Sequence, residues 1–271
     1  MQEIRFQRGN VRLLLMNHTH EHNGSAHERA ADEHPAPRPA DPRIARQIHE
    51  ALGDARSVAN VGAGAAEYEP DDRWVLAIEP TENRITRRSR GLTTPIRGHA
   101  ESLPIPSCSV DAAMACLTLH QWSDWRVGVH ELRRVARKRV VIFTYDPSYA
   151  DHFWLLRDYL PKLGHIHSQR FPPIEEQCAG TGDEVRVETV AIPHDCENGL
   201  LAAHWRRPRA YLDERVRAGI PTFQLPGAAR QLDGLEQLAE DLRTGHWQQR
   251  NHELLALEQL DLGYRLLVTE L

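Results

Sequence analysis

A glycine turn between two apolar segments constrains the fold of this chain more than any other feature of its sequence. A largely apolar segment at 57–61 leads into Gly62 and Gly64, and a second apolar segment at 75–78 ends at Glu79. Glycine has no Cβ, so the backbone bends sharply there and a ligand approaches it closely. At the carboxyl edge of a parallel sheet, such a turn forms a nucleotide-sized crevice. The pattern therefore predicts an α/β fold with a ligand site at this turn.

The residues around the turn indicate which nucleotide fits. Glu79 ends the second apolar segment, where a carboxylate is placed to accept hydrogen bonds from both hydroxyls of a ribose. A dinucleotide fold has Gly-x-Gly-x-x-Gly, but here Glu67 stands at the last glycine position and would repel a diphosphate. The chain also has no Gly-Lys-Ser or Gly-Lys-Thr of a P-loop. We therefore expect S-adenosylmethionine as the cofactor, and Glu67 argues against the alternative of a nucleotide-dependent oxidoreductase.

Further motifs follow the glycine turn in a fixed order, in the segments 96–106, 109–122 and 131–146. With them, residues 41–146 resemble the class I S-adenosylmethionine-dependent methyltransferases, in particular the UbiE-like branch of the Methyltransf_11 type. The resemblance implies a Rossmann-like, seven-stranded and mostly parallel sheet that closes with an antiparallel pair of strands. It implies transfer of a methyl group to a small-molecule acceptor, with specialised metabolism as the expected setting.

The resemblance also implies roles for individual residues. The turn would pass under the methionine part of the cofactor, and Glu79 would bind its ribose. The expected cofactor contacts are Asn60, Gly62, Gly64, Glu79, His99, Ala100, Glu101 and Leu117. His120 and Trp122, which follow the fourth strand, would face the substrate.

Three positions depart from the family pattern. Asn60 stands where the family has an acid, Ala66 replaces the third glycine, and His99 replaces an Asp. Asn60 keeps a carbonyl acceptor, and Ala66 costs little unless its φ is positive. We expect the cofactor to bind with less charge attraction. The departures leave two alternatives open, a methyltransferase-like binding or assembly protein, and an enzyme such as a cyclase that holds the cofactor without using its methyl group.

Composition narrows the class of protein. The 271 residues are 41% hydrophobic and carry a formal net charge of −5, which gives no electrostatic case for binding nucleic acid. No apolar run approaches the roughly 20 residues that span a bilayer, so no membrane partner and a cytoplasmic location are expected. The four cysteines lack C-x-x-C spacing, and the histidine-rich tract at 18–34 lies in a polar segment. We predict no metal site.

The chain divides into an extension and one large domain. Residues 1–40 are expected to be a partly disordered extension, in which Met16 is a second candidate start and the apolar stretch 11–16 a candidate contact in a homo-oligomer. Residues 41–271 are the expected methyltransferase domain, which begins with a helix at 41–52. Strands are predicted at 57–62, 73–79, 95–98, 109–116, 138–145, 183–193 and 262–269.

Two inserts, at 148–180 and 195–260, are the expected substrate cap. Trp154 and Trp205 are candidate substrate contacts, with a role as core anchors as the alternative. Arg206 would receive a substrate carboxylate or phosphate, or else be solvated. For an acceptor that loses a proton, His120 is the candidate base, although a structural role in its loop is nearly as well supported. Asp146 and Tyr145, just past the fifth strand, are the second choices, and Tyr145 is also a candidate substrate contact.

Overall fold

The computed structural model describes residues 40–86, 88, 94–182 and 184–271. The N-terminal extension, with its histidine-rich tract and the apolar stretch 11–16, lies outside the described residues. In the described part, no helix is long and apolar enough to cross a membrane, and no group of three or more His, Cys, Asp or Glu side chains is arranged to hold a metal ion.

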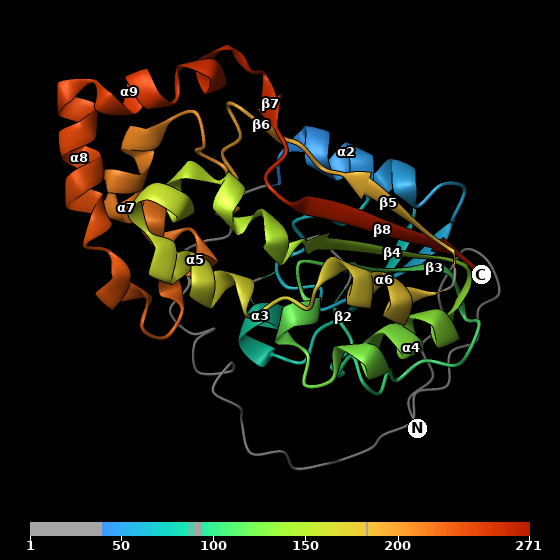
Figure 1. The fold of residues 1–271 in the computed structure, drawn as a ribbon. Helices are drawn as coiled ribbons and strands as arrows, with labels where there is room; N and C mark the ends of the chain where they lie inside the picture. The colour runs from blue at the N-terminus through green and yellow to red at the C-terminus, as the bar shows by residue number, and fades with distance from the viewer. Residues whose placement is uncertain (1–39, 87, 89–93, 183) are drawn as a thin grey trace.

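A six-stranded sheet forms the centre of the molecule (Figure 1). Its strands are β1 (Ser57–Val61), β2 (Trp74–Ile78), β3 (Val110–Cys116), β4 (Ala136–Tyr145), β5 (Val185–Thr189) and β8 (Tyr264–Glu270). They lie in the order β2-β1-β3-β4-β8-β5, and β8 alone runs antiparallel to its neighbours β4 and β5. The expected mostly parallel sheet with a closing antiparallel pair is confirmed.

The seventh strand, predicted at 95–98, is reduced to a single bridge. Ile96 pairs in parallel with Ile78 at the free edge of β2, where its N–H donates to the carbonyl of Ala77 at 2.9 Å. Gly98 beyond it is packed between Ile78 and Pro104, and the ring of that proline closes the space beside the strand edge. The predicted strand is therefore shortened to the one bridged residue, Ile96.

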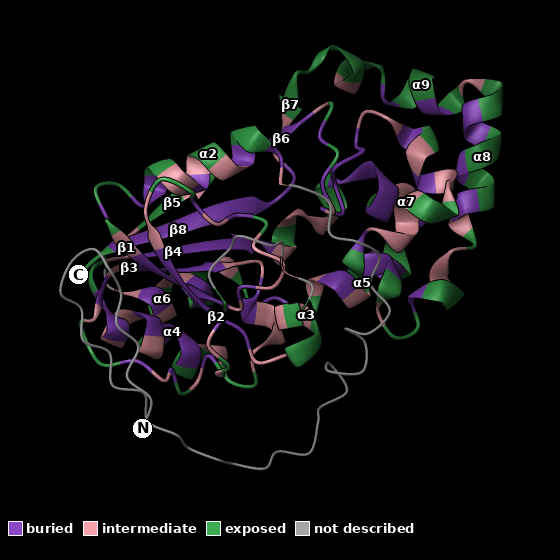
Figure 2. Cartoon of the chain, turned by 180° about the vertical axis from the view of Figure 1, so that it is seen from behind, coloured by how far each residue is buried: buried purple, intermediate pink, exposed green. Residues whose placement is uncertain are grey.

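Helices cover both faces of the sheet. On one face lies α2 (Pro42–Ala51), whose N-cap Asp41 accepts a hydrogen bond from the N–H of Arg43 at 2.9 Å. Its apolar side packs with the β4 side chains of Val141 and Phe143. On the other face lie α4 (Trp125–Val135) and α6 (Ile174–Thr181), against the alternate residues of the strands. Figure 2 shows the strands buried between these layers.

The remaining helices gather beyond the carboxyl end of β4 and form a cap on the side of α2 (Figure 1). They are α5 (Pro161–Ser168), α7 (Glu214–Ala218), α8 (Gly234–Thr244) and α9 (His246–Arg250), with short turns between them. A short antiparallel pair, β6 (Ile192–Pro193) and β7 (Gln259–Leu260), joins the cap to the sheet. The small helix α3 (Glu82–Thr86) follows β2. Within the first predicted insert, α6 packs on α4, β5 and β8, as a crossover helix does.

The cap has its own aromatic core. Trp154 is 1% exposed and its indole N–H donates to the carbonyl of Trp205 at 2.8 Å. Trp205 is fully buried, and its indole N–H donates to the carbonyl of Ile192 at 2.9 Å. The rings of Tyr211 and Trp247 meet Trp154 edge-on at centroid distances of 5.8 and 5.2 Å. A buried indole with its N–H bonded has no polar atom left for a ligand.

This placement corrects the substrate contacts expected of Trp154 and Trp205. Both tryptophans are core anchors of the cap, because their rings are enclosed and their single donors are used within the protein.

Candidate active site

The glycine turn ties three strands together at their carboxyl ends. Gly62 has a φ of 72°, and its N–H and that of Ala63 donate to the carbonyl of Ile78 at 2.9 and 3.0 Å. A Cβ on Gly62 would overlap the hydroxyl of Thr118, which follows β3. Gly64 also has a positive φ, of 49°. The turn therefore requires glycine at position 62 for two reasons, its backbone conformation and the close approach of Thr118.

Glu79 holds the turn from the end of β2. It is 1% exposed, and its two carboxylate oxygens accept the N–H of Gly64 at 2.8 Å and that of Thr81 at 3.1 Å. A carboxylate has about four acceptor positions. The bonds to Gly64 and Thr81 occupy two of them, and a ribose carries two hydroxyls. The residue predicted to bind the cofactor ribose thus also shapes the turn.

The crossover from β1 to β2 contains no helix. Residues 62–73, all of them described, form turns and bends only. A pyrophosphate site of the dinucleotide type needs a helix N-terminus after the glycine turn. The backbone therefore gives a second reason, besides Glu67, why a diphosphate does not fit and an adenosine without phosphates does.

Asn60 is hydrogen-bonded to an acid, Glu69. The side-chain amide of Asn60 donates to Glu69 at 2.9 Å, and the other oxygen of Glu69 pairs with Arg88 at 2.6 Å. Since a carboxylate only accepts, the amide nitrogen of Asn60 faces Glu69 and its carbonyl oxygen remains for a ligand. Both side chains of the ion pair are almost completely buried, and Arg88 also donates to the carbonyl of Gly64 at 3.3 Å.

Ala66, at the position of the family's third glycine, has a φ of 73°. The replacement of glycine by Ala66 therefore has a cost, since a positive φ destabilises a non-glycine residue by roughly 1–2 kcal/mol. The turn nevertheless closes, with the N–H of Ala66 donating to the carbonyl of Ala63 at 2.9 Å.

The three residues 99–101, expected to lie against the adenine, differ in burial and in their contacts. Ala100 is 5% exposed, whereas His99 is exposed. The carboxylate of Glu101 accepts the N–H groups of Ser123 and Asp124 at 2.6 and 3.2 Å, just before α4. Glu101 therefore positions this loop, which is a different use from the expected cofactor contact.

Leu117 and Trp122 follow β3. Leu117 has a φ of 51° and stays paired to the sheet, donating its N–H to the carbonyl of Phe143 at 2.7 Å. The ring of Trp122 lies against Gly128 of α4, where a Cβ would come within 2.6 Å of the ring atom Cζ3. Trp122 therefore packs on the α4 side of the sheet, opposite the cap, and the substrate contact expected of it is wrong for this arrangement.

A cluster of aromatic and histidine rings gathers where β3 and β4 end beneath the cap. The ring centroids of His120 and Phe171 are 4.5 Å apart, and those of Tyr145 and Phe171 are 5.2 Å apart. Tyr145 is 3% exposed, and burial, with a smaller effect of Asp146, raises the pKa of its phenol. His120 and Tyr145, both predicted site residues, therefore meet around one ring, while Asp146 uses one oxygen to accept the N–H and hydroxyl of Ser148.

His167 of α5 completes this cluster and was not among the predicted site residues. Its ring lies 4.8 Å from that of Tyr145 and 5.3 Å from that of Phe171. Its Nδ1 is 3.1 Å from the hydroxyl of Thr222, and its buried Nε2 has no hydrogen-bond partner. Burial, with the charge of Arg170, lowers its pKa to about 3. Its spacing of four residues from Leu163 places it on the buried face of a helix, the signal that sequence reading missed.

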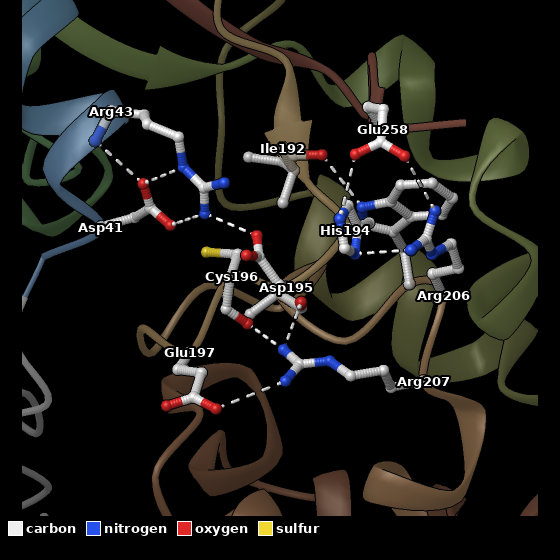
Figure 3. Close-up of polar contacts among 12 residues, drawn as sticks. Asp41, Arg43, Ile192, His194, Asp195, Cys196, Glu197, Arg206, Arg207 and Glu258 are labelled. Carbon is white, nitrogen blue, oxygen red and sulfur yellow. Dashed lines mark hydrogen bonds and ion pairs between the residues drawn. The ribbon is translucent and has the colours of Figure 1, made fainter. Parts of the chain in front are cut away.

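The arginines of the second insert stabilise the cap (Figure 3). Arg206 donates to the carbonyl of Leu257 at 2.7 Å and contacts His194 Nδ1 at 2.7 Å and Glu258 at 3.7 Å. Arg207 pairs with Glu197 at 3.5 Å. They line a cavity of about 330 Å³ next to Trp247. Since its donors already bind protein acceptors, Arg206 fastens the segment just before β7 to the cap, and neither the expected anion contact nor a solvated side chain describes it.

Known proteins share this architecture. A family model described as a methyltransferase domain, Methyltransf_11, matches residues 59–144. A solved structure from Anabaena variabilis, named as a methyltransferase from an antibiotic biosynthesis pathway, is 32% identical with a TM-score of 0.79. That match covers 88% of this chain and 100% of the other. The chain therefore belongs to the S-adenosylmethionine-dependent methyltransferases, and S-adenosylmethionine is its cofactor.

More distant structures share the fold alone. A methyltransferase from Thermotoga maritima is 19% identical over 55% of this chain and 73% of that chain, with a TM-score of 0.46. The cyclase SpnF is 17% identical over 84% of this chain and 80% of that chain, with a TM-score of 0.48. Neither similarity carries an argument about the reaction. No curated protein matches the sequence.

The positive φ of Ala66 leads to a test of the turn. Ala66→Gly should raise the free energy of unfolding by about 1 kcal/mol, because the relief of backbone strain exceeds the entropy that glycine adds to the unfolded chain. Ala65→Gly is the matched control, since Ala65 has no positive φ. This variant should have a free energy of unfolding lower by about 0.5–1 kcal/mol. Urea unfolding measures both changes. A loss of stability in Ala66→Gly would contradict the assigned conformation.

The low pKa of His167 predicts a pH dependence of stability. The pKa of a histidine in an unfolded chain is about 6.5. In the folded protein the pKa of His167 is lowered to about 3, so its ring stays neutral over this range. Between these values the unfolded chain binds the extra proton, so stability is fully present above the upper value and falls with falling pH by roughly 1 kcal/mol per pH unit. Urea unfolding at several pH values should show a shallower decline in His167→Gln. Parallel pH profiles in both proteins would show that His167 is not buried as a neutral group.

Proposed function

We propose that this methyltransferase acts on a small-molecule acceptor that binds between the carboxyl ends of β3 and β4 and the cap. The observation that carries the proposal is that the rings of His120 and Tyr145 both contact Phe171. His120 lies two residues after Thr118, the residue that packs against Gly62 of the cofactor turn. The acceptor side and the cofactor turn are thus adjacent in the fold. The relative from Anabaena variabilis, named for an antibiotic biosynthesis pathway, supports specialised metabolism as the setting.

The residues of the chain suit a displacement reaction. S-adenosylmethionine supplies the methyl group as a sulfonium. Glu79 and the glycine turn fix the adenosine end, and the enclosed rings of Phe171 and Tyr145 keep water from the acceptor side. Positioning of this kind accounts for much of the acceleration in a two-reactant step. Where the acceptor is a hydroxyl or a protonated amine, an imidazole nitrogen of His120 takes up the proton.

The His120 assignment is tested by turnover. His120→Gln should lower kcat about a hundredfold or more, because the base is lost, and should leave the dissociation constant of S-adenosylmethionine unchanged. His130→Gln is the control, since His130 is exposed on α4. Release of S-adenosylhomocysteine, measured with a panel of hydroxylated and amino aromatic acceptors, reports the activity.

Two results would overturn parts of this proposal. Equal kcat in His120→Gln and the wild-type protein would assign His120 to a structural role in its loop. Tight cofactor binding without methyl transfer to any acceptor, but with conversion of a polyene to a ring, would favour the cyclase alternative.

A further inference from the structure

His167 carries an unused polar atom into the acceptor side of the site. The residue is 6% exposed and lies on the side of α5 that faces β4. Its Nδ1 is bonded to Thr222, whereas Nε2 is buried and has no hydrogen-bond partner. Buried polar atoms in folded proteins are nearly always paired, and an exception calls for an explanation such as a missing ligand. The cap therefore presents one unsatisfied nitrogen to the cluster around Tyr145.

Arg170 supplies a cation in the region of His167, where burial and this charge lower the pKa of the imidazole. It follows α5, and its N–H donates to the carbonyl of His167 at 3.3 Å. Among the described residues, no carboxylate lies within ion-pair distance of its guanidinium, although the side chain is partly buried and burial lowers its pKa. Most other arginines on the cap, such as Arg206 and Arg207, have carboxylate partners. A partly desolvated guanidinium without a counter-ion favours an anionic ligand.

The side chains packed around the ring of His167 are flat and apolar. Phe171 is 7% exposed and lies on the segment between α5 and α6, with its ring against those of His120, Tyr145 and His167. Aromatic rings at these separations suit a planar body that stacks or packs edge-on. Because the rings contact one another, an acceptor has to displace Phe171 from at least one of its neighbours.

We propose that His167 and Arg170 recognise a carboxylate on a planar, apolar acceptor, and so determine the substrate class of this methyltransferase. In the tautomer with the proton on Nε2, the hydroxyl of Thr222 donates to Nδ1 and the N–H of Nε2 is the donor for a ligand. One oxygen of the acceptor's carboxylate accepts a hydrogen bond from Nε2. The carboxylate also accepts hydrogen bonds from the guanidinium of Arg170. A single guanidinium and a neutral imidazole match a singly charged carboxylate better than a doubly charged phosphate.

This inference rests on the proposed acceptor site between β4 and the cap, and it is tested by binding. The probes are 4-hydroxybenzoate and its neutral isostere 4-hydroxybenzamide, each titrated calorimetrically into the full-length protein saturated with S-adenosylhomocysteine. The wild-type protein should bind the carboxylate at least about tenfold more tightly than the amide, the difference expected for hydrogen bonds to a charged group. Arg170→Gln and His167→Gln should each remove most of this preference.

Matched controls come from the same helical region. His165→Gln changes an exposed histidine of α5, and Arg157→Gln changes an arginine that already pairs with Asp158 at 2.7 Å. Both should keep the wild-type preference for the carboxylate. If His167→Gln fails to fold, the Arg170 variant alone decides the result.

Equal affinity for the two probes, no binding of the carboxylate by the wild-type protein, or an unchanged preference in Arg170→Gln would each overturn the inference. Failure of the proposed function gives a different result. In that case the preference for the carboxylate persists and depends on Arg170, while no acceptor gains a methyl group.

Discussion

The buried carboxylate of Glu79 is the interaction on which the site depends. It accepts the N–H of Gly64 from the turn after β1 and that of Thr81 beyond β2, so one charged group fixes the distance between two strand ends. Thr118 fills the space that a side chain at Gly62 would occupy, and it adds the end of β3 to the same arrangement. Because a buried charge is stable only when it is paired or hydrogen-bonded, the turn and Glu79 have to form together. The carboxylate predicted to bind the ribose is thus oriented by the protein's own backbone.

The cap depends on a second set of buried polar bonds. The indoles of Trp154 and Trp205 each donate to a main-chain carbonyl, and Arg206 ties the segment before β7 to the same core. Arg43 pairs with both Asp41 and Asp195 at 2.6 Å, which connects the start of α2 with the cap (Figure 3). With the cap fixed in this way, α5 holds His167 against Tyr145 at the end of β4, so this group proposed to recognise the acceptor lies on a helix and not on a free loop.

Local signals in the sequence were sufficient to predict the sheet, the helix at α2 and the turn with Glu79, because periodicity, capping and glycine placement act over short distances. Long-range packing decided the rest. The segment predicted as a strand at 95–98 forms only the bridge at Ile96, and Trp122 turns to α4 because Gly128 makes room for its ring. Trp154 and Arg206 carry the same side chains that a ligand site would need, and only their partners across the cap identify them as structural.

The central claim is that Glu79 organises and binds the cofactor, and calorimetric titration with S-adenosylmethionine and S-adenosylhomocysteine tests it most directly. Glu79→Gln puts an amide NH₂ against a backbone N–H and removes the charge that is proposed to accept the ribose hydroxyls. Glu82→Gln is the control, on the exposed first turn of α3. The account predicts binding by the wild-type and Glu82→Gln proteins, and affinity at least about a hundredfold weaker in Glu79→Gln. Equal affinity in all three proteins, or no binding by the wild-type protein, would contradict it.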